Sequence, residues 1–297
     1  MSNQDNGIIR KLYNKGLLNV EQEFAKDVHY EVITGSVAYN MSTGESDTDV
    51  VGICIPPVDW VFPYSVGGFI EGFGPNPPKF ENFQQHHIQL NDKEYDISIY
   101  SIVKFFQLAA ENNPNIIDLL YVPDRLVTHS DNIGKLIRQN RKLFLTKNSF
   151  HKFKGYAFAQ LKKMKTMNVK KSRKDLFEKY GYDVKYGAHL LRLALEAEMI
   201  LTEHDLDLGR NAELLKSVRR GEWTLEQIET WFREKELDLN KMYLDSTLRY
   251  SPDWPELTRV LLCCLEEKYG SISKYVNSTV DNRILRKFEQ IKQILES

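Results

Sequence analysis

Cysteine is scarce in this chain of 297 residues, which contains only Cys54, Cys263 and Cys264 and has no C-x-x-C pair. Two adjacent cysteines rarely pair with each other, so the pattern argues against a disulfide framework and against a zinc site built on cysteine. All three residues stand in apolar runs. We therefore expect reduced thiols that pack in a core, in a cytoplasmic protein.

Long apolar runs are also missing. No stretch approaches the roughly 18 continuous apolar residues of a membrane-spanning helix. The first residues, M-S-N-Q-D-N-G, lack the features of a secretory signal, so we expect no membrane partner. Net charge is almost absent as well, because 40 Lys and Arg balance 41 Asp and Glu. The whole-chain charge therefore indicates no partner, and no feature indicates an oligomeric state.

Acidic residues are absent from one segment, residues 132–174, which holds 14 Lys or Arg. A phosphate-tracking surface for RNA is one interpretation, because aromatic side chains that interleave with the cations could stack on unpaired bases. Solvated helix faces and a mobile basic linker over residues 165–174 are the other interpretation. The interleaved aromatic residues are Phe144, Phe150, Phe153, Tyr156 and Phe158.

The patterning predicts an α+β protein with a mixed sheet first and helices second. We place a catalytic domain at residues 1–125 and an all-helical nucleotide- and acceptor-binding domain at residues 126–297. The predicted strands cover residues 28–33, 49–55, 88–90 and 94–100. The predicted helices cover residues 7–25, 101–113, 115–121, 131–138, 150–164, 185–202, 224–234, 255–269 and 281–295.

Two carboxylates separated by one residue, Asp47 and Asp49, stand at the entrance of the second strand. Alternation along a strand projects them to one face, where their charges repel and a divalent cation such as Mg²⁺ relieves the repulsion. The Gly35-Ser36 turn upstream could offer backbone N–H groups and a hydroxyl to a phosphate. A third acid on the same face, Asp96, with Glu94 as the alternative, would complete a two-metal site.

Three other interpretations of this D-x-D pattern compete with nucleotidyl transfer. It could be a turn in which the Asp side chains accept from backbone N–H groups. It could be the motif of a phosphoaspartyl phosphotransferase, although Glu45 and Ser46 precede it in place of a buried strand. It could also be a sugar-nucleotide motif, which gives no reason for the Gly35-Ser36 turn.

The combination G-S-x-A-Y and S-D-T-D-V-V-G-I resembles the DNA polymerase β-like nucleotidyltransferase superfamily. N-P-N-I-I-D-L-L, G-Y-A-F-A-Q-L and K-Y-G-Y-D-V-K-Y-G-A-H-L-L-R-L resemble its branch of predicted nucleotidyltransferases associated with bacterial and phage RNA repair. The likeness spans roughly residues 31–230. It departs from the usual pattern at Val37, where we expect a polar or basic residue, and at Asn40, where a Gly is usual.

The resemblance implies a palm-like domain that uses two Mg²⁺ ions, with Mn²⁺ as an alternative, and a nucleoside triphosphate as substrate. It implies that Gly35 and Ser36 hold the triphosphate. It also implies that Asp47, Asp49 and Asp96 hold the metal ions.

Three polar residues of the helical half, Lys185, His189 and Arg192, share one predicted helical face. Lys185 and Arg192 could balance the charge of a triphosphate, and His189 could be either a general base or a structural histidine. A solvated helix face is the alternative for all three. Tyr180 and Tyr182 could stack on a base or pack internally.

We predict that an NMP is transferred from an NTP to a hydroxyl, with release of pyrophosphate. The acceptor we favour is an RNA end, including that of tRNA. Nucleotidylation of a small molecule, nucleotidylation of a protein by an antitoxin-like enzyme, and a non-catalytic nucleotide-binding module are the alternatives. His86 and His87 find no third ligand in strand or helix register, so we interpret them as loop or strand surface.

Overall fold

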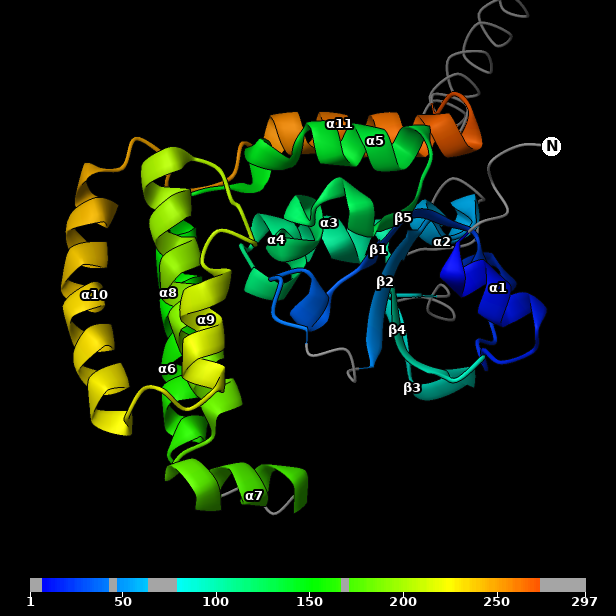
Figure 1. Ribbon diagram of the computed structural model, residues 1–297. Helices are drawn as coiled ribbons and strands as arrows, with labels where there is room; N and C mark the ends of the chain where they lie inside the picture. The colour runs from blue at the N-terminus through cyan, green and yellow to red at the C-terminus, as the bar shows by residue number, and fades with distance from the viewer. Residues whose placement is uncertain (1–6, 43–46, 64–78, 167–170, 273–297) are drawn as a thin grey trace, which may run out of the picture.

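A five-stranded mixed sheet and a group of long helices make up the computed structural model, which describes residues 7–42, 47–63, 79–166 and 171–272 (Figure 1). The sheet has the strand order β3-β4-β2-β1-β5, and β2 and β4 form its parallel pair. The α+β prediction is confirmed. The strands are β1 Val28–Ile33, β2 Thr48–Cys54, β3 Asn82–Leu90, β4 Lys93–Ser101 and β5 Val127–Ser130.

The two faces of the sheet are covered by different elements. Every second residue of β2 and β4, such as Val50 and Ile97, packs with α1 (Ile8–Asn14) in a small buried cluster. The intervening residues face the other way, toward the rest of the molecule. Because side chains alternate along a strand, Asp49 and Asp96 lie on this second face.

Helices fall into two groups in Figure 1, one against the sheet and one beside it. The most extensive helix–helix contact is between α6 and α8, and α9 and α10 also pack on α8. Those against or near the sheet are α1 and also α2 Val58–Val61, α3 Ile102–Ala110, α4 Pro114–Tyr121, α5 Asn132–Gln139 and α11 Trp254–Tyr269. The others are α6 Asn148–Met164, α7 Lys171–Tyr180, α8 Val184–Glu203, α9 Ala212–Arg219 and α10 Leu225–Asp245.

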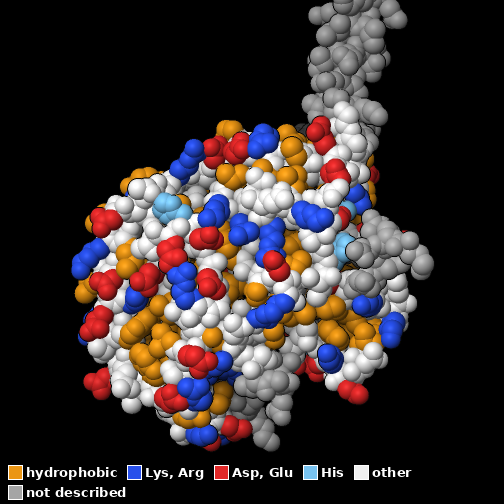
Figure 2. All heavy atoms as spheres, turned by 45° about the horizontal axis from the view of Figure 1, so that its top comes forward, with side chains coloured by type: hydrophobic (Ala, Val, Ile, Leu, Met, Phe, Trp, Pro, Cys, Tyr) orange, Lys and Arg blue, Asp and Glu red, His pale blue; other side chains and the backbone are white. Residues whose placement is uncertain are grey.

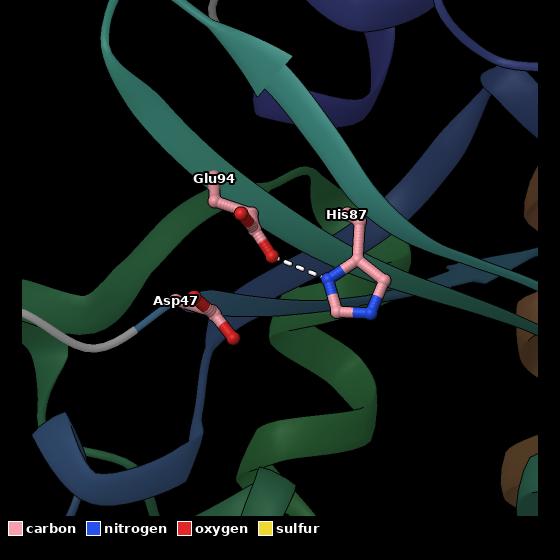
Figure 3. Close-up of side chains that lie close together, drawn as sticks. All are labelled: Asp47, His87 and Glu94. Carbon is pink, nitrogen blue, oxygen red and sulfur yellow. Dashed lines mark hydrogen bonds and ion pairs between the residues drawn. The ribbon is translucent and has the colours of Figure 1, made fainter. Parts of the chain in front are cut away.

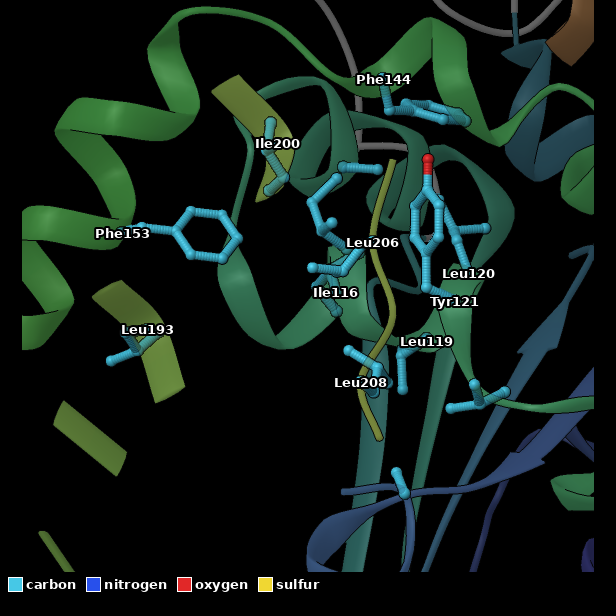
Figure 4. Close-up of a cluster of buried hydrophobic side chains, with 14 of the residues drawn as sticks. Ile116, Leu119, Leu120, Tyr121, Phe144, Phe153, Leu193, Ile200, Leu206 and Leu208 are labelled. Atoms are coloured by element: carbon cyan, nitrogen blue, oxygen red, sulfur yellow. The ribbon is translucent and has the colours of Figure 1, made fainter. Parts of the chain in front are cut away.

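One buried apolar cluster extends from the second face of the sheet through α4 into the helices (Figure 4). Ile116 and Leu119 come from α4, whereas Phe153 comes from α6 and Leu193 from α8. Burying each such side chain contributes about 1.5–3 kcal/mol. Helix α4 therefore joins the acidic face of the sheet to the helices on one continuous core.

Several helix starts follow the predicted capping chemistry. The Ser101 hydroxyl accepts from the backbone N–H of Lys104 at 3.2 Å. Thr224 and Gln227 form the predicted capping box at the start of α10. The Ser101 and Thr224 hydroxyls thus each accept from a backbone N–H group that a helix start leaves without a partner in the helix.

Several sequence predictions are wrong in extent or kind. The helix predicted to end at residue 234 continues to Asp245 as α10. The first helix ends at Asn14 and does not reach residue 25, because Gly16 adopts a left-handed φ of 68°. Residues 171–174, predicted as linker, begin α7. Strands β3 and β5 show the remaining errors, since β3 starts at Asn82 and β5 lies in the half predicted as all-helical.

Helix α9 was not predicted, and the predicted helix 281–295 lies outside the described residues. The division into domains 1–125 and 126–297 stays a prediction, although β5 pairs with β1 beyond that boundary. All three cysteines are free thiols. Within the described ranges, no helix combines the length and the apolar character needed to cross a bilayer.

Candidate active site

Two acids lie side by side at the centre of the sheet. Strands β2 and β4 run parallel with Asp49 directly opposite Asp96 in the register. Two residues further along, Val51 and Ser98 are opposite each other and line the same cavity as the acids. Asp47 is exposed and precedes β2 by one residue. The structure thus brings all three predicted acids to one end of the parallel pair.

The acid pair is electrostatically unfavourable by itself. Burial raises the pKa of Asp49, and the charges of Asp96 and Asp47 raise it further. Burial also acts to raise the pKa of Asp96, but the backbone N–H of His87 at 2.8 Å and the imidazole of His86 at 3.0 Å bring it below its ordinary value. Asp96 is therefore held as a carboxylate whose charge opposes ionisation of Asp49 unless a cation lies close by.

The Gly35-Ser36 turn approaches Asp49 so closely that only glycine fits. Gly35 has a φ of 71°, and a Cβ atom on it would lie 2.0 Å from Oδ2 of Asp49. The backbone N–H of Thr34 donates to the carbonyl of Asp49 at 2.9 Å and fixes this approach. Ser36 follows in the 3₁₀ turn η3 (Gly35–Val37). The turn predicted to hold phosphate therefore lies directly against a predicted metal ligand.

The departure from the usual pattern at Asn40 has a structural reason. Asn40 adopts a left-handed φ of 54°. Asn is the residue that tolerates this conformation best after Gly. Its side-chain carbonyl also accepts a hydrogen bond from Arg125. The loop can therefore keep a backbone shape that favours Gly, although Asn occupies the position.

A cavity of about 270 Å³ opens in front of the acids. The turn at Gly35 forms one wall, α4 contributes Asn115 and Leu119, and α8 contributes His189 and Arg192. The sheet supplies Asp49 and Asp96. The acids, the glycine turn and the helices thus enclose one common space.

The sequence matches the RNA repair pathway DNA polymerase beta family, RlaP, over residues 9–248. The chain belongs to this family. It is also 34% identical over 131 residues to an uncharacterized 38.9 kDa protein from the nrdC-mobD intergenic region of Enterobacteria phage T4. That alignment covers 43% of this chain and 36% of the phage protein, so the chain spans about a third of the length of this curated relative.

A solved structure, the nucleotidyltransferase-like protein from Exiguobacterium sibiricum 255-15, aligns with 97% of this chain and 92% of its own at 12% identity. Its TM-score of 0.30 is too low to carry an argument about either fold. The RlaP assignment therefore depends on the sequence match alone.

Arg192 of this RlaP family member is not on a solvated helix face. It is buried, and its guanidinium is paired with Asp118 of α4 and with Glu196, the latter at 3.3 Å. It also donates to the hydroxyl of Tyr39, which follows the glycine turn. The predicted polar stripe is therefore divided, since Lys185 and His189 are exposed. Only His189 and Arg192 of the three line the cavity.

The two predicted base-stacking tyrosines lie elsewhere. Tyr182 is fully buried and its hydroxyl donates to the carbonyl of Trp223 at 2.8 Å, so base stacking by Tyr182 is ruled out in this conformation. Tyr180 packs against Gly221 and carries Lys179 over its ring at 4.9 Å. Neither tyrosine is among the residues that line the acidic cavity. The burial of Tyr182 agrees with the internal-packing alternative, whereas base binding by the half-buried Tyr180 stays a prediction.

His86 and His87 are exposed residues of strand β3, which agrees with the prediction of loop or strand surface, but both also contact acidic side chains. A β-bulge shifts the register of β3 between Gln85 and Ile88, and His87 has a left-handed φ of 58°. Consequently both imidazoles meet acids, His86 at Asp96 and His87 at Glu94. The hydrogen bond that the His87 imidazole donates to the Glu94 carboxylate raises the pKa of His87. Strict strand alternation could not predict this, because a bulge places consecutive residues on one face.

A second cavity of about 630 Å³ adjoins the first and lies between α6 and α8. Both cavities are lined by Asn115, His189 and Arg192, so they are contiguous. We call the second cavity the α6–α8 groove. It is also lined by His151, Lys152, Tyr156, Gln160, Lys163 and Tyr186, and none of the described residues that line it is acidic.

Part of the positive charge of the acid-free segment 132–174 is paired with acids from other parts of the chain. Lys154 pairs with Glu236 at 2.6 Å, and Lys142 pairs with Asp205 at 2.7 Å. On the face shown in Figure 2, basic and acidic side chains are interspersed. The part of the segment that the structure describes is therefore not uniformly basic, and two of its cations, Lys152 and Lys163, line the groove.

Proposed function

We propose that this chain transfers a nucleoside monophosphate from an NTP to a hydroxyl group at an RNA end and releases pyrophosphate. The observation that carries the proposal is the arrangement of Asp49 and Asp96 in register, with Gly35 pressed against Asp49. Membership of the RNA repair pathway family supports RNA as the acceptor class.

The donor set of the acids fits divalent cations. Asp47, Asp49 and Asp96 offer carboxylate oxygens, which suit Mg²⁺ and Mn²⁺. The raised pKa of Asp49 and the mutual repulsion of the acids are the features that a bound cation would relieve. When bound, two such ions stabilise the charge on the attacking and leaving oxygens of an in-line displacement.

The protein's own residues position the substrates. The close approach of Gly35 to Asp49 leaves backbone N–H groups and the Ser36 residue beside the acids, where a triphosphate would lie. His189 stands between this cavity and the α6–α8 groove. It could orient a hydroxyl that enters from the groove, and Asp96, which lines the same cavity, could accept its proton.

The α6–α8 groove supports a polyanionic acceptor over a cationic small molecule. Its lining offers Lys152 and Lys163 for phosphates, and Tyr156 and Tyr186 for bases. Base stacking on aromatic side chains contributes about 1–3 kcal/mol per base. A pocket for a cationic substrate would be expected to contain carboxylates.

Label transfer tests the proposal directly. Each α-labelled NTP is incubated with RNA that ends in a 3′-hydroxyl, with and without Mg²⁺. We expect label in the RNA, pyrophosphate in solution, and no product without the metal. RNA that ends in a 3′-phosphate is the matched control, because it lacks the attacking hydroxyl.

Asp49→Asn should remove this activity while the chain stays folded. Loss of a direct ligand should cost more than the roughly 10- to 100-fold that loss of an outer-sphere partner costs. Transfer that persists in this variant, or the absence of transfer to any RNA with any NTP, would reject the proposal.

A further inference from the structure

Asp47, His87 and Glu94 form a second cluster of ligand-type side chains beside the acid pair. One potential ligand atom from each lies within 4.8 Å of the others. Figure 3 shows the three side chains pointing toward one another, with the imidazole of His87 hydrogen-bonded to Glu94. Asp47 and His87 are exposed, so an ion could enter from solvent.

Three separate elements build this cluster. The bulge in β3 turns His87 toward β4, where Glu94 lies two residues before Asp96 and therefore on the same face. Gln89 donates to the other carboxylate oxygen of Glu94 at 2.6 Å and orients it. Asp47 arrives from the residue that precedes β2. The ligand atoms are thus brought together by tertiary structure and not by one local motif.

The donor set of this cluster differs from that of the acid pair. Asp49 and Asp96 supply oxygen alone, the ligand type that Mg²⁺ prefers. The cluster combines one imidazole with two carboxylates, and imidazole suits Zn²⁺ and neighbouring transition metals. Three protein ligands also leave room for water in a tetrahedral zinc site.

We propose that His87 and Glu94, together with Asp47, which the proposed function also counts among its metal ligands, bind a divalent transition-metal ion, with Zn²⁺ as its best match, next to the oxygen-only position at Asp49 and Asp96. Binding replaces the proton between His87 and Glu94 with the metal ion. This inference goes beyond the proposed function, because such binding requires neither nucleotide nor RNA.

Titration calorimetry on the metal-free full chain tests the proposal, with Zn²⁺ and then Mg²⁺ as the titrant. We expect stoichiometric Zn²⁺ binding that excess Mg²⁺ does not displace. His87→Asn should weaken it by more than the roughly 10- to 100-fold loss associated with outer-sphere partners. Asn is chosen because it tolerates the left-handed φ of 58° at this position.

Three further variants make the result specific. Glu94→Gln, which keeps the size of the side chain, should also lose Zn²⁺ affinity and gives a second test if His87→Asn does not fold. His129→Ala removes an imidazole from β5, at the opposite edge of the sheet, and should leave the affinity unchanged. His86→Ala should likewise leave it unchanged, because His86 faces Asp96.

Two results would overturn the proposal: Zn²⁺ affinity unaffected by His87→Asn and Glu94→Gln, or loss of affinity in His86→Ala alone. The readout separates this inference from the proposed function. A chain that binds Zn²⁺ as described but transfers no nucleotide rejects only the proposed function. A chain that transfers nucleotide with Mg²⁺ while these variants bind Zn²⁺ normally rejects only the inference.

Discussion

At the scale of single residues, the close approach of Gly35 to Asp49 is the most restrictive feature of the site. The backbone conformation at Gly35 favours glycine, and the space that a side chain would need is filled by a carboxylate oxygen. Two independent constraints therefore act on one position. The effect of the backbone conformation can be measured apart from the effect of the missing space. Gly16 has nearly the same φ, 68°, but a Cβ atom added to it would have nothing within 4 Å.

We predict that Gly35→Ala abolishes nucleotidyl transfer, whereas Gly16→Ala only lowers stability. Both alanines carry the left-handed backbone cost of about 1–2 kcal/mol. Only the alanine at position 35 displaces Asp49. Urea denaturation and label transfer measured on both variants check this. Equal activity in the two variants would show that the close approach to Asp49 has no functional consequence.

Asp49 should also destabilise the metal-free chain. Its folded pKa is raised, so the folded state binds a proton more readily than the unfolded state and loses stability as pH rises through the raised pKa. We predict that metal-free Asp49→Asn melts no lower than the unaltered chain at neutral pH. The difference should shrink as the pH falls into the acid range.

Thermal melts over a pH series, with and without Mg²⁺, measure this effect. Added Mg²⁺ should raise the melting temperature of the unaltered chain and leave that of Asp49→Asn nearly unchanged. A variant that is clearly less stable than the unaltered chain at neutral pH without metal would contradict the prediction.

At the scale of elements, a buried ionic cluster joins α8, α4 and the loop after the glycine turn. Arg192 pairs with Asp118 and Glu196, and Tyr39 donates to Asp118. Burial raises the pKa of Tyr39 well above its ordinary value, so its hydroxyl remains a donor. Burial likewise raises the pKa of Glu196 well above its ordinary value. Burial raises the pKa of Asp118 as well, so one guanidinium faces two carboxyl groups that both resist ionisation. Because Glu196 is less closely paired with Arg192 than Asp118 is, we expect Glu196 to be the one that carries a proton.

We predict that Arg192→Met costs about 3–5 kcal/mol of unfolding free energy, because it leaves buried carboxylates without their cation. Glu196→Gln should cost no more than about 1 kcal/mol, the net value of one hydrogen bond. Urea denaturation of both variants provides the measurement. A large loss in Glu196→Gln and a small one in Arg192→Met would reverse this assignment of charges.

The pH dependence follows from the same cluster. An acid whose folded pKa is raised makes the folded state less stable as pH increases above the unfolded value of 4.5. Glu196→Gln removes this penalty, so its stability relative to the unaltered chain should improve as pH rises above that value. A stability difference that does not change with pH would indicate that Glu196 stays ionised in the folded chain.

At the scale of the whole molecule, the positive charge that a ligand would meet depends on which Lys residues pair with acids and which line a cavity, and not on how many Lys residues a segment contains. Lys154 and Lys142 of the basic segment are paired with acids of other elements, whereas Lys152 and Lys163 line the α6–α8 groove. Lys152 is also within 3.6 Å of Glu111, a separation that ranks as a loose ion pair. The groove and the acidic cavity share residues of α8, so a strand in the groove would end near the acids.

We predict that a Lys152→Gln, Lys163→Gln double variant weakens binding of single-stranded RNA and reduces its salt dependence. The slope of log affinity against log salt should fall by about 0.7 for each RNA phosphate that the variant no longer neutralises. Lys142→Gln with Lys154→Gln is the matched control, since it removes the same charge from positions that do not line the groove. Binding titrations across a salt series that give equal slopes for both variants would remove the groove from the RNA path.

Much of the fold could be predicted from local chemistry. β1, β2 and β4 follow from short apolar or alternating runs, and α3 and α10 from capping residues. The predicted acids and the Gly35 turn depend on spacing within one stretch and on strand alternation. Each of these is a property of neighbouring residues, which is why the sequence alone could indicate them.

Tertiary structure decided the remainder. The four residues of β5 become a strand only by pairing with β1, which comes nearly 100 residues earlier in the chain. Arg192 looks polar and accessible in a helical pattern, yet packing buries it. The bulge at His87 brings an imidazole to Glu94 and Asp47, which alternation excludes. Local sequence determines which residues alternate and cap, whereas burial and long-range register depend on what the rest of the chain places against them.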